Sequence, residues 1–387
     1  MNKTRRALWT LLAASAVAAG LGELSWRWLR EGTEAYQMHF RDSERKPYWP
    51  ERASREEQVA FHIRIQRFVE APMPRSGVPE WLPGARFFLC YTGPRQPYFD
   101  ADGCVEYRFN ELGLRDRPGL TWDKPAGTTR VLCLGDSFTL GWGVRQEHNW
   151  PVLVEQELGK RWPYVQLVNA GGAGSSYADE YAAALVHRFG RLQPDVVLVT
   201  LCLNDLLVTN GKLCQYRDEA LAPAGTVLGS ALLGDLVHLA RTQRALDLDP
   251  EDDVVPKLLG LPADDPAFTS KNETPAIYWQ GDAPQQALRT IRDWCRANGA
   301  KPAVVLWPFL QGLGPGRHYP FVTMHRLVEE FCASEQLPLL DLLPVLADVP
   351  AESLWVSRVD MHPNERAQQL VTPVLSAFVA DTAGLGR

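Results

Sequence analysis

Short apolar runs alternate with amphipathic segments from residue 130 to the end of the chain. The runs are rich in valine and leucine and have the length of strands, whereas the segments between them repeat apolar residues at helical spacing. Parallel strands that are covered by helices on both faces show this pattern, because both faces of the sheet are buried. We therefore predict five parallel strands, over residues 131–134, 165–168, 196–203, 303–307 and 339–341.

The helices between these strands have recognisable ends. Asn149 is a typical N-cap for a helix that Gly159 ends, and Ser176 stands three residues before Asp179 as in a capping box. We expect Pro373 to kink or interrupt the last helix, because proline has no backbone N–H to donate. The remaining helices are predicted over residues 285–298, 323–335 and 364–379.

The first 30 residues have a pattern of their own. Three basic residues lie within the first six positions, and the stretch 7–24 that follows has Glu23 as its only ionisable side chain. This pattern is typical of a membrane anchor or of a cleaved signal peptide, and two small-x-small sites would allow cleavage. Trp26 and Trp28 favour a retained anchor, with the rest of the chain on the outer side of the membrane. A buried N-terminal helix is the alternative.

Two further stretches depart from the strand–helix alternation. Residues 31–125 are rich in Pro, Trp, Tyr and Arg, and we interpret them as a wrapping segment with a possible helix over 55–69 and a short strand over 104–109. Residues from about 206 to 278 are predicted to be an insertion into the domain that spans 126–387. Its acidic stretch 247–253 lacks the glycine and the terminal glutamate of a calcium loop, which favours a solvated loop.

Composition and charge exclude several classes of protein. The chain has 387 residues, of which 45% are hydrophobic and 22% charged, and a formal net charge of −6. These values are typical of a globular protein and exclude disordered, collagen-like and polytopic membrane proteins. The basic residues are dispersed among acidic ones, so we expect no nucleic-acid partner.

The seven cysteines are compatible with an oxidising compartment. Cys90 with Cys104, and Cys202 with Cys214, are close enough in sequence to be bridged. No CxxC or HExxH motif occurs, so we predict neither a metal nor another cofactor. Three cysteines fall inside apolar segments and are expected in the core: Cys133, Cys295 and Cys332.

Residues that can carry chemistry follow the predicted strands. In an open parallel sheet, ligands bind where loops leave the carboxyl ends of the strands. Ser137 follows the first strand, a glycine cluster over 169–174 follows the second, Asn204 follows the third, and His362 precedes the last helix. Taken singly, these features could be a capped turn, a phosphate cradle, a helix cap and a surface histidine.

Jointly, they supply what acyl transfer to a serine requires. A hydroxyl is a poor nucleophile at neutral pH, so Ser137 needs an imidazole that can accept its proton, and His362 is the candidate. Asp360 lies two residues before His362, on the same face if the segment is extended. In that position the carboxylate can hold His362 in the required tautomer.

These motifs resemble those of the SGNH (GDSL-type) hydrolase superfamily over about residues 130–380, without the insertion. The matching blocks are Gly-Asp-Ser at 135–137, the glycine cluster at 169–174, Asn-Asp at 204–205, and Asp360 with His362. The resemblance implies a three-layer α/β/α, flavodoxin-like sandwich with a five-stranded parallel sheet. It also implies Ser137 as the nucleophile, His362 as the base, and an oxyanion hole made by the backbone N–H groups of Ser137 and Gly174 with the Asn204 amide.

Two positions depart from the usual motifs of the superfamily. Cys202 replaces the usual glycine of the third block, which leaves the Asn204 donor in place. The last block reads Asp-x-His where Asp-x-x-His is common, and this spacing is similar to that of exported, N-terminally anchored bacterial members. The role of Asp360 is therefore less directly implied than that of His362.

The sequence thus predicts a serine-dependent carboxylic-ester hydrolase, membrane-anchored or secreted, with its catalytic domain on the periplasmic or extracellular side. Acylated envelope polysaccharide or lipid is the expected substrate class, and a small-molecule ester stays open. One alternative is an O-acyltransferase of cell-envelope glycans that uses the same triad, and another is a catalytically silent polysaccharide-binding module. Three aromatic side chains near strand ends could form a substrate platform or belong to the core: Trp142, Trp307 and Phe309.

Overall fold

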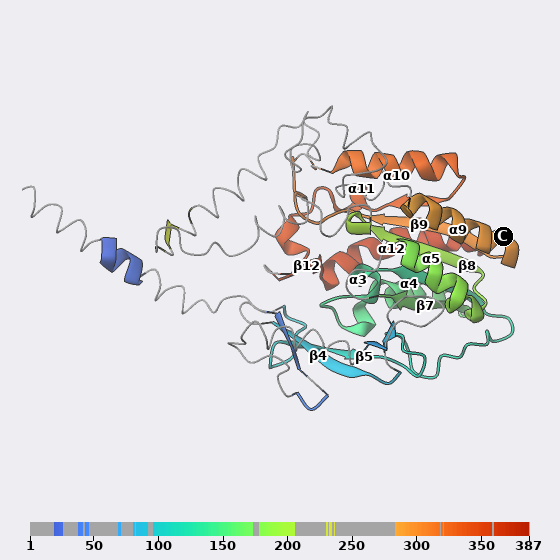
Figure 1. The fold of residues 1–387 in the computed structure, drawn as a ribbon, viewed down its shortest axis with the longest axis horizontal. Coiled ribbons are helices and arrows are strands. Elements are labelled where there is room, and N and C mark those ends of the chain that lie inside the picture. The colour runs from blue at the N-terminus through green and yellow to red at the C-terminus, as the bar shows by residue number, and fades with distance from the viewer. Residues whose placement is uncertain are drawn as a thin grey trace, which may run out of the picture.

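A five-stranded parallel sheet forms the centre of the molecule (Figure 1). The computed structural model describes residues 19–25, 38–41, 43–45, 69–70, 80–81, 83–91, 96–172, 178–205, 230, 232–233, 236, 283–317, 319, 321–357 and 360–386. The strand order is β10-β9-β8-β6-β7, and every neighbouring pair is parallel. All five predicted strands are confirmed, as β6 (Thr129–Gly135), β7 (Val165–Gly171), β8 (Val196–Cys202), β9 (Lys301–Trp307) and β10 (Leu339–Asp341).

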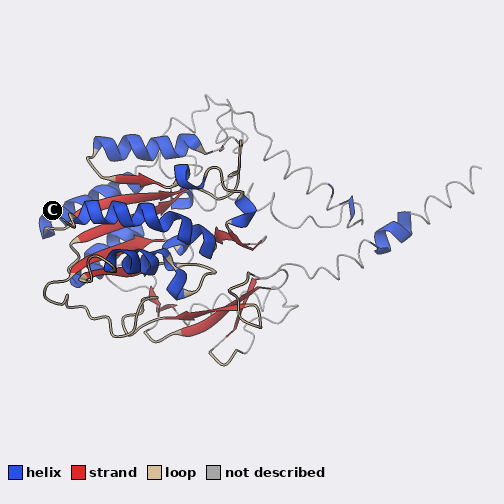
Figure 2. Cartoon of the chain, turned by 180° about the vertical axis from the view of Figure 1, so that it is seen from behind, coloured by secondary structure: helices blue, strands red, loops and turns tan. Residues whose placement is uncertain are grey.

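Helices cover both faces of this sheet, which confirms the α/β class (Figures 1 and 2). Helix α4 (Trp150–Gly159) packs beside α12 (Glu365–Ala383), and α5 (Ala178–His187) packs beside α9 (Ala283–Asn298). Helix α10 (Val322–Ser334) contacts the edge strand β10. The middle strand β8 is buried at every position, as the unbroken apolar run predicted.

The predicted cap at Asn149 is confirmed, and Asn364, which was not singled out as a cap, is a second one. Asn149 caps α4 by accepting from the Trp150 N–H, and Asn364 caps α12 by accepting from the Ala367 N–H. Of the two effects expected of Pro373, a kink or an interruption, the interruption does not occur, because α12 runs through it to Ala383. Pro373 and Gln369 both lie on the exposed side of α12, so the carbonyl that loses its partner can be hydrated. The capping box at Ser176 lies outside the described residues.

The segment before the central sheet contains strands of its own. Strand β4 (Arg86–Tyr91) lies between β1 (Met38–Arg41) and β5 (Cys104–Arg108) in an antiparallel sheet, and β2 (Val69–Glu70) pairs with β3 (Glu80–Trp81). The strand predicted over 104–109 is thereby confirmed. Most of the possible helix at 55–69 lies outside the described residues, and Val69 belongs to β2.

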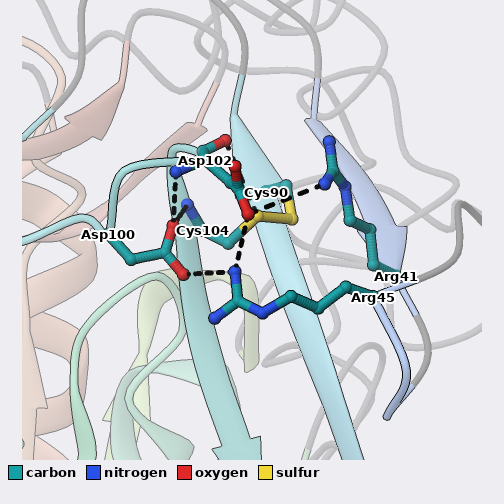
Figure 3. The surroundings of a disulfide bond; sticks show 6 residues. All are labelled: Arg41, Arg45, Cys90, Asp100, Asp102 and Cys104. Atoms are coloured by element: carbon teal, nitrogen blue, oxygen red, sulfur yellow. Dashed lines mark hydrogen bonds and ion pairs between the residues drawn. A yellow bond between two sulfur atoms is a disulfide. The ribbon is translucent and has the colours of Figure 1, made fainter.

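A disulfide joins β4 to β5 between Cys90 and Cys104, which stand opposite each other in the strand register (Figure 3). This was one of the two pairings that spacing allowed. Arg45 lies close by and forms ion pairs with Asp100 and Asp102 in the loop before β5 (Figure 3). The link and the ion pairs hold the antiparallel sheet together at this end.

The other cysteines are buried. Cys202 is a buried thiol at the end of β8, and Cys214, its candidate partner, lies outside the described residues. The prediction of core positions for three further thiols is confirmed, since each is at most 1% exposed: Cys133, Cys295 and Cys332.

The antiparallel sheet packs against the loops at the carboxyl end of the central sheet (Figure 1). Tyr91 and Tyr107 of this sheet share a hydrophobic cluster with Leu140, which follows β6, and with Val356 near the C-terminus. Trp142 packs against the same cluster. The segment before residue 126 therefore contacts the place where the candidate chemistry was expected.

Two expectations fall largely outside the described part of the chain. Of the N-terminal stretch 7–24, only residues from 19 onward are described, as a helix that reaches residue 25. Within the described residues, no helix is both long and apolar enough for a membrane span. Of the predicted insertion, residues 230, 232–233 and 236 alone are described.

Candidate active site

Ser137 stands where strand β6 of the central sheet passes into a short helix, α3 (Ser137–Leu140). Asp136 caps this helix, since its carboxylate accepts from the Phe138 N–H at 2.9 Å. The side chain of Ser137 is only 7% exposed. Its backbone N–H donates to no acceptor among the described residues. The turn thus fixes the hydroxyl at the carboxyl end of the sheet, and the amide remains available for a bound oxygen.

Asp360 and His362 lie on β12 (Asp360–Pro363), which forms an antiparallel hairpin with β11 (Trp355–Ser357). Because the segment is extended, the two side chains share a face, as the spacing predicted. Asp360 Oδ1 lies 2.5 Å from His362 Nδ1 and also accepts from the His362 backbone N–H at 3.2 Å. Strand β12 contacts α3, and His362 Nε2 comes within 2.7 Å of Ser137 Oγ. The structure therefore brings all three side chains into one hydrogen-bonded chain.

Which atom donates in each of these hydrogen bonds follows from the chemistry of the side chains. A carboxylate only accepts, so His362 Nδ1 carries the proton that it shares with Asp360. Nε2 then has a lone pair and accepts from the Ser137 hydroxyl. Burial raises the pKa of Asp360, but the adjacent His362 and a hydrogen bond from Tyr91 outweigh it, and the pKa ends below its usual value. Asp360 is consequently ionised at neutral pH, as an orienting carboxylate must be.

Tyr91, at the end of β4, is a site residue that the sequence analysis missed. Its hydroxyl donates to Asp360 Oδ2 at 2.5 Å across 269 positions of sequence. Burial, and then the negative charge of Asp360, raise the pKa of Tyr91 well above its ordinary value, so the phenol keeps its proton. Nothing in the sequence around Tyr91 distinguishes it from the other tyrosines of the segment. Its place in the site comes from the packing of the N-terminal sheet on the hairpin, where Tyr91 shares a cluster with Val356 of β11.

The loop after α3 is held by two further residues of the N-terminal segment. Arg115 is 1% exposed and donates to the carbonyls of Leu140 at 3.0 Å and Val144 at 2.5 Å. Tyr107 accepts from the Gly143 N–H at 2.6 Å, and the Arg115 guanidinium lies 3.9 Å from the centre of its ring. Burial lowers the pKa of Arg115. The carbonyl dipoles around this cation replace the water that it has lost.

The predicted oxyanion residues are only partly described. Gly174 lies outside the described residues, and Asn204 is described by its backbone alone, in the 3-10 turn η3 (Leu203–Asp205). The adjacent Asp205 is buried and accepts from the Cys202 N–H at 2.7 Å and from the Tyr181 hydroxyl at 2.8 Å. Burial, and then the negative charge of Asp136, raise the pKa of Asp205 well above its usual value. These bonds fix the turn that carries Asn204.

Aromatic rings border the hydrogen-bonded chain. The His362 ring lies 5.5 Å from that of Phe138 and 5.8 Å from that of Trp142. Trp142 is partly exposed, whereas Trp307 and Phe309 are buried and belong to the main core. Of the three aromatic candidates for a substrate platform, the structure therefore leaves Trp142 beside the candidate base and places the other two in the core.

The family of the chain follows from a match over residues 133–370 to the model of the GDSL-like lipase/acylhydrolase family. This range covers more than half of the protein and includes Ser137, Asp360 and His362, whereas Tyr91 lies before it. The chain belongs to this family. It is an SGNH-type esterase, with the α/β fold and the five-stranded parallel sheet expected from its motifs.

Several solved structures are similar to the chain at low sequence identity. TesA is 19% identical, with a TM-score of 0.35 over 65% of this chain and 99% of its own. The esterase EstA from Pseudoalteromonas sp. is 14% identical, with a TM-score of 0.36 over 66% of this chain and 97% of its own. A two-domain esterase active on acetylated mannans is 11% identical, with a TM-score of 0.37 over 66% of this chain and 50% of its own. No curated protein matches the chain.

Proposed function

We propose that this esterase works through an acyl-enzyme, with Ser137 as the nucleophile, His362 as the base and Asp360 as the orienting carboxylate. The observation that carries the proposal is the unbroken chain from Ser137 Oγ through the His362 ring to Asp360, with contacts of 2.7 and 2.5 Å. A serine, a base and an oriented carboxylate at hydrogen-bond distance are the parts that nucleophilic acyl transfer requires.

The proposed reaction has two halves. Ser137 Oγ attacks the ester carbonyl carbon while its proton passes to His362 Nε2, and the same proton then leaves on the departing alcohol. Water enters next, gives a proton to His362 Nε2 and its oxygen to the acyl carbon. Release of the carboxylic acid returns that proton to Ser137. Asp360 keeps the ring in place and stabilises the imidazolium that forms in each half.

The oxyanion donors are part of the proposal. The N–H of Ser137, with no acceptor among the described residues, supports a role as one donor. The backbone N–H of Gly174 and the side chain of Asn204 would supply the others. We expect Asn204→Ala to lower kcat by about 10² to 10³-fold, because one oxyanion donor is worth that much. Asn298→Ala, at the end of α9 and far along the chain, is the control and should keep the kcat of the unsubstituted protein.

The compartment and the substrate class rest on the N-terminal half of the chain. The Cys90–Cys104 disulfide supports an oxidising compartment, and the basic residues before the apolar stretch 7–24 support export with an anchor or a cleaved signal peptide. In that setting, residues 31–125 form a wrapping segment on the hydrolase domain. An acylated polysaccharide or lipid of the cell envelope is then the proposed ester.

The test is labelling of the purified full chain with a fluorophosphonate probe, with the modified residue mapped by mass spectrometry. Labelling is expected at Ser137 and should disappear in both Ser137→Ala and His362→Ala. Ser353→Ala is the matched control, since the hydroxyl of this half-buried serine donates to the Pro350 carbonyl, and the variant should label normally. A folded protein that takes up no probe would contradict the acyl-enzyme and favour a binding module.

A further inference from the structure

Asp360 uses both of its carboxylate oxygens, and each faces a different part of the chain. Oδ1 accepts from the ring and the backbone of His362, whereas Oδ2 accepts from the Tyr91 hydroxyl. The Asp360 side chain is almost completely buried. A buried carboxylate oxygen that accepts no hydrogen bond costs folding free energy. His362 bonds only to Oδ1, so the Tyr91 hydroxyl supplies the donor that Oδ2 needs.

The position of Tyr91 is itself tightly determined. Its ring stacks on Phe99 at 5.1 Å, and its backbone N–H donates to the Gly103 carbonyl at 2.9 Å. The neighbouring Cys90 is tied to β5 by the disulfide. A Cβ atom at Gly143 would come within 2.9 Å of the Tyr91 hydroxyl oxygen, so the glycine leaves the space that this hydroxyl occupies. A phenol held in this way can fix the position of the Asp360 carboxylate.

We propose that Tyr91 is a positioning residue of the esterase: its hydroxyl fixes Asp360, and through Asp360 the His362 ring, in the orientation that faces Ser137. The inference rests on the proposed triad and extends it into the N-terminal segment. Tyr91 does not exchange a proton with the substrate. Its effect is to hold one rotamer of the carboxylate and to disperse part of its negative charge.

The other groups around Asp360 do not duplicate this contact. His362 is the titratable partner on its own strand, and Tyr98 and Tyr107 are the further titratable groups of the N-terminal segment that face it. The Tyr98 hydroxyl donates to the Gly143 carbonyl, and the Tyr107 hydroxyl is engaged with Gly141 and Gly143. Within the described residues, Tyr91 alone donates to Asp360 Oδ2.

Kinetics of Tyr91→Phe test the proposal in the full chain. We expect kcat to fall about 10-fold with KM nearly unchanged, because a hydrogen bond to a buried charge is lost while the substrate contacts remain. We also expect the acid limb of the kcat/KM profile to move to higher pH. Without the Tyr91 donor the carboxylate is more basic, and the Asp360–His362 pair then holds its inactivating proton more tightly.

Tyr107→Phe is the matched control. It removes another buried hydroxyl of the same sheet, which has no hydrogen bond to Asp360, so it should lower thermal stability without moving the acid limb. Normal kcat and a normal pH profile in folded Tyr91→Phe would overturn the proposal. An equal shift of the acid limb in Tyr107→Phe would also overturn it.

A shape-conserving variant covers the case in which Tyr91→Phe does not fold. A monofluorinated tyrosine at position 91 is a stronger donor of nearly the same size, so the acid limb should move the opposite way, to lower pH. An unmoved limb in the fluorinated protein would count against any coupling between Tyr91 and Asp360.

A spectroscopic measurement separates this inference from the proposed function. The proton between His362 Nδ1 and Asp360 should give a downfield proton resonance that His362→Ala removes, whether or not the protein hydrolyses any ester. Tyr91→Phe should shift that resonance, and an unchanged resonance would overturn the inference. Failure of probe labelling at Ser137 together with a shifted resonance would remove the proposed reaction and leave the contact between Tyr91 and Asp360 in place.

Discussion

Gly171 offers a sharp test of how closely helix α3, which begins at Ser137, packs on the sheet. It is the last residue of β7, and a Cβ atom there would lie 2.2 Å from the Leu140 nitrogen and 2.7 Å from the Thr139 carbonyl carbon. Both atoms belong to the backbone of α3, so no side-chain rotation can relieve the overlap. We expect Gly171→Ala to push α3, which begins at Ser137, away from β7.

The size of the effect follows from these distances. Ordinary van der Waals contact lies near 3.5 Å, so α3 has to move by roughly 1 Å. A displacement of this size at the reacting atoms costs on the order of 10²-fold in rate, and overpacking of a tight interior costs about 1–3 kcal/mol of stability. Gly171→Ala should therefore lose about 10²-fold in kcat/KM and should also unfold at a lower temperature.

Ester hydrolysis and thermal unfolding are measured side by side, with Gly159→Ala as the matched control. Gly159 ends α4, and a Cβ atom there would meet nothing within 4 Å. Alanine is a better helix former than glycine, so this control should keep its activity and its stability. Wild-type kcat/KM and Tm in Gly171→Ala would refute the close approach of α3 to β7.

Two further predictions concern stability. Replacement of Cys90 and Cys104 by serine should lower the free energy of unfolding by about 3 kcal/mol, because the disulfide closes a loop with a sequence separation of 14. Denaturant titration without reductant measures this change. An unchanged unfolding midpoint would contradict the prediction. The lowered pKa of Asp360 means that its carboxylate stabilises the fold above the unfolded pKa of about 3.9, and that this contribution is lost as the pH falls through the folded pKa. The advantage of the unsubstituted protein over Asp360→Asn in urea should therefore shrink between pH 6 and strongly acidic pH, and a gap independent of pH would speak against an ionised Asp360.

The sequence was most informative where local patterns decide structure. The strand positions followed from unbroken apolar runs, and Asp360 and His362 could be placed on one face because an extended chain alternates its side chains. Ser137 could be placed at the end of β6 because the Gly-Asp-Ser turn directly follows a buried strand. Each of these inferences needs only neighbouring residues.

The parts that escaped prediction depend on contacts between distant segments. The hydrogen bond of Tyr91 to Asp360 spans 269 positions, and Arg115 contacts carbonyls 25 and 29 positions away. Neither residue belongs to a motif, and both lie in a segment of weak periodicity. The interruption expected at Pro373 does not occur for another reason: the cost of a missing hydrogen bond depends on whether the freed carbonyl faces water.

The contact of the N-terminal sheet with the β11–β12 hairpin also limits how this protein can be divided or recombined. A fragment that starts at residue 126 would lose the donor to Asp360 Oδ2 and the Arg115 cation that gathers the carbonyls of the loop after α3. If residues 31–125 were exchanged for the corresponding segment of a relative, we expect esterase activity to survive only if the new segment places a phenol and a guanidinium where Tyr91 and Arg115 lie. We therefore expect residues 31–125 and the hydrolase domain that follows them to be inherited as one unit.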